Sequence, residues 1–172
     1  MKKALKRLVW LVLLAGGVLA GLYVLGSRTA HYRAHVDIAA VPERVYAHLV
    51  EPDSIRQWVD GVVSLKLIGE ARGVGTLAHM VVEDEGRQYS MTNEVLALDT
   101  NRIFSVRIVS EVFVATNTFQ LEVISNATRV HQTMHTDYIG IPMRVFAPIF
   151  KTLAEQQMEA DLQRLKVLAE AD

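Results

Sequence analysis

The chain begins with an uninterrupted apolar run. From Leu8 to Gly26 it reads LVWLVLLAGGVLAGLYVLG, without a charged residue. At 1.5 Å per residue, a helix of this length spans about 28 Å, close to the roughly 30 Å hydrocarbon core of a bilayer. A core helix of a soluble protein would keep a polar face, and this run has none. The pattern predicts one transmembrane helix over 8–26.

A cleaved signal peptide is the alternative interpretation of this segment. Residues 1–7 are basic, and Ala20 is a small residue of the kind that cleavage requires. The apolar run, however, continues through Leu25, beyond an ordinary signal-peptide core. Because four basic residues precede the run and only Arg28 and Arg33 closely follow it, the positive-inside rule places 1–7 in the cytoplasm. We therefore expect a single-pass protein of the inner membrane with an extracytoplasmic domain, 31–172.

After a linker at 27–30, the hydrophobic pattern changes to period two. Over 31–40 one face carries Tyr32, Ala34, Val36 and Ile38, and the other carries His31, Arg33, His35 and Asp37. This alternation predicts a half-buried strand. Pro42 and Pro52 then fit the first positions of two short helices, the second of which carries Trp58.

Strand patterns dominate the middle of the chain, and a helical period closes it. Short turns separate six expected strands, at 62–69, 75–83, 88–98, 102–110, 112–124 and 128–138. Such short connections require antiparallel neighbours. A helical stripe then runs from Phe146 to Ala169, with Pro148 expected in the first turn or at a kink. The order predicts an α+β domain: a curved seven-stranded antiparallel sheet around a long C-terminal helix, with a cavity between them.

Composition and charge exclude several classes of protein. The chain is 51% hydrophobic and has no cysteine, which excludes a disordered tail, a disulfide scaffold and a cysteine-ligated zinc module. The first thirty residues carry a formal charge of +5 and the remainder −6. An acidic domain is a poor nucleic-acid binder, since that affinity depends on Lys and Arg. We expect no nucleic-acid partner.

The segment HVDIAAVPERVYAHLVEPDSIRQWV (35–59) and the closing LQRLKVLAE (162–170) carry a family resemblance. The chain resembles the START-like, SRPBCC superfamily over 31–170, particularly its polyketide cyclase/dehydrase-like and lipid-transport branch. This resemblance implies a helix-grip fold around an apolar cavity for lipids, sterols, polyketides or other hydrophobic molecules.

Strand parity together with the resembled fold suggests which residues line that cavity. Methionine and aromatic side chains suit an adaptable apolar pocket, and a few polar groups orient a ligand within it. The same residues would also serve ordinary core packing, and that alternative stays open at each position. The expected ligand-binding set is Trp58, Met80, Met91, Asn93, Phe113, Ala115, Asn117, Phe119, Met134, Tyr138, Phe146, Phe150 and Met158.

Metal and catalytic sites are not expected. His31, His35, His131, His135 and Asp137 share faces of two strands that neighbour each other in the resembled fold, but these faces oppose the apolar ones. We expect a solvated polar surface there. No phosphate loop, zinc helix or nucleophile elbow occurs, so we expect no catalytic residue and no cofactor. The acidic run 83–85 is typical of a hydrophilic hairpin tip.

Three hypotheses for function follow. The leading one is a membrane-anchored protein that binds a hydrophobic or lipid-like small molecule without transforming it. The second is a cyclase- or dehydratase-like enzyme with an ionisable group of shifted pKa in the cavity. The third is a non-catalytic module that docks a protein partner. The apolar stretch 139–150 is either a packed junction or, if exposed, a patch suited to a bilayer.

Overall fold

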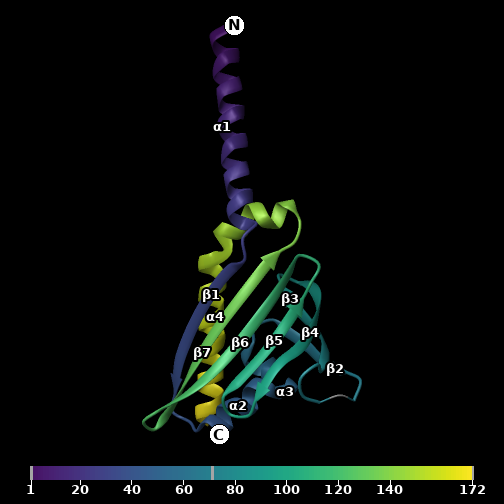
Figure 1. The fold of residues 1–172 in the computed structure, drawn as a ribbon, viewed down its shortest axis with the longest axis vertical. Coiled ribbons are helices and arrows are strands. Elements are labelled where there is room, and N and C mark those ends of the chain that lie inside the picture. Colours follow the sequence, from purple (N-terminus) through teal and green to yellow (C-terminus); the bar gives the residue numbers. More distant parts are fainter. Residues whose placement is uncertain (1, 71, 172) are drawn as a thin grey trace.

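The chain folds into an apolar N-terminal helix and a sheet that curves around a second long helix (Figure 1). The computed structural model describes residues 2–70 and 72–171. Its elements are α1 (Lys2–Gly26), β1 (Ala30–Ile38), α2 (Pro42–Val50), α3 (Pro52–Trp58), β2 (Val62–Ile68), β3 (Leu77–Asp84), β4 (Arg87–Asp99), β5 (Ile103–Val109), β6 (Phe113–Ile124), β7 (Ala127–Tyr138) and α4 (Ile141–Ala171). The α+β class, the seven strands and the long C-terminal helix confirm the sequence-based prediction.

The seven strands form one antiparallel sheet in the order β1-β7-β6-β5-β4-β3-β2. Strands β3 to β7 are joined by connections of two or three residues, eight residues separate β2 from β3, and β1 completes the sheet beside β7. The β3–β4 turn consists of two residues, Glu85 and Gly86, and both have positive φ, 48° and 75°. Two such residues form the hairpin turn whose twist matches that of the strands.

The hydrophobic core lies between the inner face of β1 and β7 and the C-terminal two thirds of α4. Met158, Leu162, Leu165 and Ala169 form the buried stripe of α4, at the helical spacing expected from the sequence. They pack with Tyr32, Val36, Ile38 and Val130 of the sheet and with Leu49 and Trp58 of α2 and α3. Because α4 packs mainly along β1, the inner face of β3–β5 is left largely uncovered by it.

Pro148 lies inside α4, and the helix bends there. Figure 1 shows the first part of α4 crossing the end of α1, and the remainder turning down along the sheet. A proline within a helix removes a hydrogen bond and clashes with the preceding turn. Of the two places expected for Pro148, the kink is therefore the one adopted. We call residues 141–148 the α4 arm.

The α4 arm is in contact with the end of α1. Gly26 is buried, and a Cβ built on it would lie 1.7 Å from the carbonyl oxygen of Arg144. The Arg144 guanidinium lies over the Tyr23 ring, donates to the Tyr23 hydroxyl at 3.3 Å and donates to the Tyr138 carbonyl at 3.1 Å. We call this contact the α1–α4 junction. It fixes the apolar helix to the domain.

The apolar helix meets the length and composition criteria for a membrane span. Its segment Val9–Gly26 has a mean hydropathy of 2.2, and only 6% of it is buried against the protein. A signal sequence near an N-terminus satisfies the same criteria. The structure therefore shows an exposed apolar helix that suits either an anchor or a signal sequence.

The outer face of β1 and β7 is polar, as expected. His31 pairs with His135, their ring centroids 4.5 Å apart, and His35 pairs with His131 at 6.2 Å. Asp37 on the same face accepts two hydrogen bonds from Arg129. Among the residues that the structure describes, no three His, Asp or Glu side chains lie close enough together to hold a metal ion.

Candidate functional site

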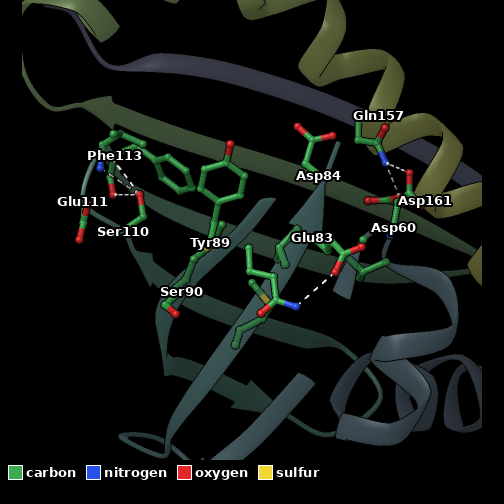
Figure 2. Close-up of a pocket in the computed structure, with 17 residues that line it drawn as sticks. Asp60, Glu83, Asp84, Tyr89, Ser90, Ser110, Glu111, Phe113, Gln157 and Asp161 are labelled. Atoms are coloured by element: carbon green, nitrogen blue, oxygen red, sulfur yellow. Dashed lines mark hydrogen bonds between the residues drawn. The ribbon is translucent and has the colours of Figure 1, made fainter. Parts of the chain in front are cut away.

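A cleft of about 860 Å³ opens where α4 leaves the sheet uncovered. Figure 2 shows it between the β3–β4 hairpin, the β5–β6 turn and one side of α4. This volume lies within the range of small-molecule sites, about 300–1,000 Å³. The lining residues are Val59, Asp60, Gly61, Met80, Val82, Glu83, Asp84, Gln88, Tyr89, Ser90, Met91, Ser110, Glu111, Val112, Phe113, Gln157 and Asp161.

The apolar part of the lining comes from two neighbouring hairpins. Met80 on β3 pairs directly with Met91 on β4, so both side chains point to the inner face. Val112 and Phe113 contribute apolar surface from the β5–β6 turn and the start of β6. Flexible thioethers and an aromatic ring form a surface that can adjust to ligands of different shape.

The polar part of the lining is acidic. It includes five carboxylates, from Asp60, Glu83, Asp84, Glu111 and Asp161, and none of the described lining residues is Lys, Arg or His. Figure 2 shows Glu111 at one end of the cleft and Asp60 with Asp161 at the other. Glu83 accepts a hydrogen bond from Gln88 at 3.2 Å. The resulting negative potential disfavours an anionic ligand.

Asp161 on α4 is the most buried of these carboxylates, its side chain 14% exposed. Its Oδ1 accepts hydrogen bonds from Gln157 Nε2 at 3.0 Å and from the backbone N–H of Asp60 at 3.3 Å, and it contacts Arg164. Arg164 also donates to the Trp58 carbonyl at 2.9 Å. Burial raises the pKa of the Asp161 carboxyl, and the donors and Arg164 offset this only in part. Asp161 thus joins α4 to the end of α3 while facing the cleft.

Because burial raises the pKa of Asp161 while its hydrogen bonds and Arg164 lower it, the titration of Asp161 directly tests the site geometry. We expect its carboxyl to titrate with a pKa above 3.8 in a ¹³C NMR experiment on the folded protein. The folded state then binds the proton more tightly than the unfolded chain. The contribution of Asp161 to stability is therefore full below pH 3.8 and is lost as pH rises through the folded-state pKa.

Asp161→Asn, which cannot titrate, is the matched variant. The difference in unfolding free energy, wild type minus D161N, should fall as pH rises above 3.8. A difference that grows with pH would mean that the Arg164 contact outweighs burial, and the assignment above would be wrong.

A pair of hydroxyl groups lies inside the domain. Tyr32 on β1 is 1% exposed, and its hydroxyl is 2.8 Å from that of Tyr138 on β7. Burial, followed by this hydrogen bond, raises the pKa of Tyr32. Tyr32 is therefore protonated at neutral pH, so its hydroxyl can take part in hydrogen bonds but cannot act as a base. Phe150 packs beside Tyr138, with ring centroids 6.4 Å apart.

The structure divides the thirteen candidate ligand-binding residues among three places. Met80, Met91 and Phe113 line the cleft. Trp58, Ala115, Phe119 and Met158 are buried, and Asn93, Asn117 and Met134 are half-buried on or beside the same inner sheet face. Tyr138, Phe146 and Phe150 lie at the end near the α4 arm, where Phe146 is 49% exposed. The bend at Pro148 turns Phe146 away from the sheet interior, where the helical spacing had placed it.

The two amides differ in their hydrogen bonding. Asn117 Oδ1 accepts from Gln132 Nε2 at 3.1 Å, so this side chain has a partner within the sheet. Asn93 Nδ2 reaches only the sulfur of Met80, at 3.6 Å, and its buried Oδ1 makes no hydrogen bond in the structure. A buried amide oxygen without a partner is costly, so Asn93 is the better candidate for a polar contact to a ligand.

The acidic lining was not found from the sequence. Glu83 and Asp84 were interpreted only as part of a hydrophilic hairpin tip, and Asp60, Glu111 and Asp161 were given no role. Asp161 precedes the buried Leu162, and no feature of its sequence neighbourhood separates it from a surface carboxylate. Only the three-dimensional arrangement of the turns and α4 brings the five together.

One family model covers nearly the whole domain. The model of the family described as polyketide cyclase/dehydrase and lipid transport matches residues 29–170. The chain belongs to this family. The match confirms the resemblance stated from the sequence, and it covers the polyketide cyclase/dehydrase-like domain from β1 to the end of α4. No curated protein matches the sequence.

Solved structures reproduce the fold of this polyketide cyclase/dehydrase-like domain. TTHA0849 from Thermus thermophilus is 21% identical, with a TM-score of 0.70 over 83% of this chain and 98% of that one. The Zhui aromatase/cyclase from Streptomyces sp. R1128 is 15% identical, with a TM-score of 0.71 over 83% and 94%. Ara h 8.0201 is 10% identical, with a TM-score of 0.65 over 84% and 100%. At these identities the likeness establishes the fold alone.

Proposed function

We propose that the protein is a membrane-anchored binding protein for a hydrophobic small molecule, held in the cleft between the β3–β4 hairpin, the β5–β6 turn and α4. The observation that carries this proposal is the cleft itself: about 860 Å³ with an apolar wall that includes Met80, Met91 and Phe113. Burying each methylene of a ligand from water contributes about 0.8 kcal/mol. A ligand that comes from lipid gains little from this term, so shape and polar contacts must select it.

The charge of the lining narrows the ligand class. Five carboxylates surround the apolar wall, and Arg164 contacts two of them, Asp60 and Asp161, without lining the cleft. An anionic head group, such as that of a free fatty acid, would be repelled. We therefore propose an uncharged or cationic amphiphile, with its polar group toward the acidic lining and its apolar part against Met80 and Met91.

The anchor and its orientation are part of the proposal. Val9–Gly26 is exposed, apolar and long enough to cross a bilayer. The four basic residues within 1–7 favour a cytoplasmic N-terminus. The domain would then lie on the extracytoplasmic side of the inner membrane. Retention of α1 is supported by the α1–α4 junction, because a buried glycine and an arginine contact join the helix to the domain.

Narrowing the cleft should weaken binding. Met91→Trp places a larger side chain on the cleft wall, and we expect it to reduce affinity for the neutral fluorescent probe N-phenyl-1-naphthylamine about tenfold, since overpacking a fitted site costs about 1–3 kcal/mol. Thr92→Trp is the matched control, because Thr92 is the next residue on β4 and points to the outer face. Fluorescence titration of both variants measures the difference. Equal affinities would place the probe elsewhere and contradict the site.

One observation favours a second candidate, a cyclase- or dehydratase-like enzyme. Asp161 is an ionisable group in the cleft whose pKa burial raises, as general acid catalysis would require. Turnover of a poly-β-ketone analogue with loss of water by the wild type, and its abolition in Asp161→Asn with probe binding retained, would establish this activity. A pure binding protein would show neither. The open cleft argues against a module that only docks protein partners.

A further inference from the structure

Exposed apolar side chains gather in the sequence at the start of α4, in the segment before it and in the β5–β6 turn. We call six of these side chains, each at least 43% exposed, the apolar rim: Val112, Ile139, Ile141, Phe146, Ile149 and Leu153. Lys151 is the one charged residue among the exposed positions of 139–153. The sequence left open whether the segment 139–150 is packed or exposed. The structure shows 139–142, Phe146, Pro148 and Ile149 exposed, 143–145 and Phe150 half-buried, and Ala147 buried. Where such exposed apolar side chains are contiguous, they mark a contact site.

The rim is tied to α1 and to the wall of the cleft. Arg144, in the α4 arm, contacts Tyr23, and Gly26 lies directly against the arm backbone. The Ile139 backbone N–H donates to the Val112 carbonyl at 2.8 Å, which joins the β5–β6 turn to the start of α4. Val112 belongs to both surfaces, since it also lines the cleft. The rim, the end of α1 and one wall of the cleft are therefore neighbours.

The orientation of the α4 arm fits a membrane surface. Figure 1 shows the first part of α4 lying across the end of α1. A helix that crosses the end of a span in this way lies near the bilayer surface when the span is upright. Ala147 faces the protein and is buried, whereas Phe146 and Ile149 are exposed. Exposed apolar side chains on a helix at the end of a span are of the kind that an interfacial helix buries in the headgroup region.

We propose that the apolar rim rests in the surface of the bilayer that α1 crosses, and that the cleft exchanges its ligand with the lipid next to Val112. This deepens the proposed function and rests on its anchor. We take lipid as the occupant because α1 is almost uncovered by protein. A bilayer that surrounds α1 would reach the end of this helix, where the α4 arm and the rim lie. Within 139–153, an ordinary water-facing surface would carry more charge than the single exposed Lys151.

Site-directed spin labelling of the full chain tests this proposal. The natural sequence has no cysteine, so each label is unique. Ile149→Cys reports on the rim, Val18→Cys on the span, and Val123→Cys serves as the matched control. Val123 is 68% exposed and lies near the β6–β7 turn, which Figure 1 shows at the end of the sheet away from α1. The labelled proteins are reconstituted in liposomes of phosphatidylcholine and phosphatidylglycerol, and collision rates with oxygen and with nickel–EDDA are measured.

In lipid, a label meets oxygen readily but is protected from the water-soluble nickel complex. We expect the label at 149 to show a several-fold lower nickel collision rate than the label at 123, with oxygen collisions at least as frequent. The label at 18 should be protected still more strongly. Circular dichroism of each labelled protein confirms that the domain is folded.

The other outcomes overturn the proposal in distinguishable ways. A protected label at 18 with equal nickel collision rates at 149 and 123 would mean that the anchor is correct and the rim faces water. A label at 149 shielded from both reagents would mean that a second copy or another protein covers the rim. Exposure of the label at 18 would remove the anchor and the rim proposal together. The probe titration of Met91→Trp, which depends on neither label, would still decide ligand binding.

Discussion

Replacing Leu162 by alanine is expected to lower the free energy of unfolding by about 2–5 kcal/mol. Leu162 is 0% exposed and lies at the centre of the stripe by which α4 packs on the sheet. The shorter side chain loses its transfer free energy and leaves a cavity that the surrounding core fills only in part. Since folded domains are stable by about 5–15 kcal/mol, the variant loses a large part of its stability.

Val167→Ala is the control on the same helix. Val167 is 70% exposed, and we expect its replacement to change the unfolding free energy by no more than about 0.5 kcal/mol. Urea denaturation of the full chain in detergent, followed by circular dichroism, measures both. Similar denaturation midpoints for the two variants would show that the packing of α4 on the sheet is not as described.

Gly26→Ala should break the packing contact between α1 and the α4 arm without unfolding the domain. The added Cβ would lie 1.7 Å from the Arg144 carbonyl oxygen and 2.7 Å from its carbon, and real Cβ atoms essentially never approach others within 3.0 Å. Both atoms belong to backbone, which cannot rotate away, so the end of α1 must move off the α4 arm by more than 1 Å. We expect the contact between Tyr23 and Arg144 to be lost with it.

Pulsed EPR distances between labels at Val24→Cys and Lys151→Cys report this separation. The wild-type background should give one narrow distribution, and Gly26→Ala a shifted or broadened one. Gly21→Ala is the matched control, since a Cβ there meets nothing within 4 Å. Unfolding of the domain by urea should be alike in all three. An unchanged distribution in Gly26→Ala would contradict the described junction.

The spacing of apolar residues and the residue types at the turns were enough to predict most of the fold. The alternation at 31–40 and the short turns at 84–87, 99–102 and 125–127 define strands and force antiparallel pairing, whatever the tertiary contacts. Each expected strand agrees with the structure to within about two residues. The stripe of α4 was equally clear, because helical spacing and burial coincide from Met158 onward.

The candidate site was less accessible to sequence reasoning. Strand parity placed Met80, Met91 and Phe113 on the inner face, where they line the cleft, yet the same parity holds for Ala115 and Phe119, which are core residues. Which inward residues meet open space depends on where α4 crosses the sheet, and no local pattern encodes that. The bend at Pro148 also decided the placement of Phe146, and a proline signals a bend without its direction.

The connection between α1 and β1 is only three residues long, 27–29. Even fully extended, such a link reaches about 10 Å, so a domain whose apolar helix stays embedded cannot travel to a facing membrane. Transfer of a ligand across a wider aqueous gap would need a soluble carrier protein that binds to this domain and takes up the ligand. Under the proposed function, the domain would therefore bind and release its ligand at the membrane that holds α1 and would not carry it across the gap.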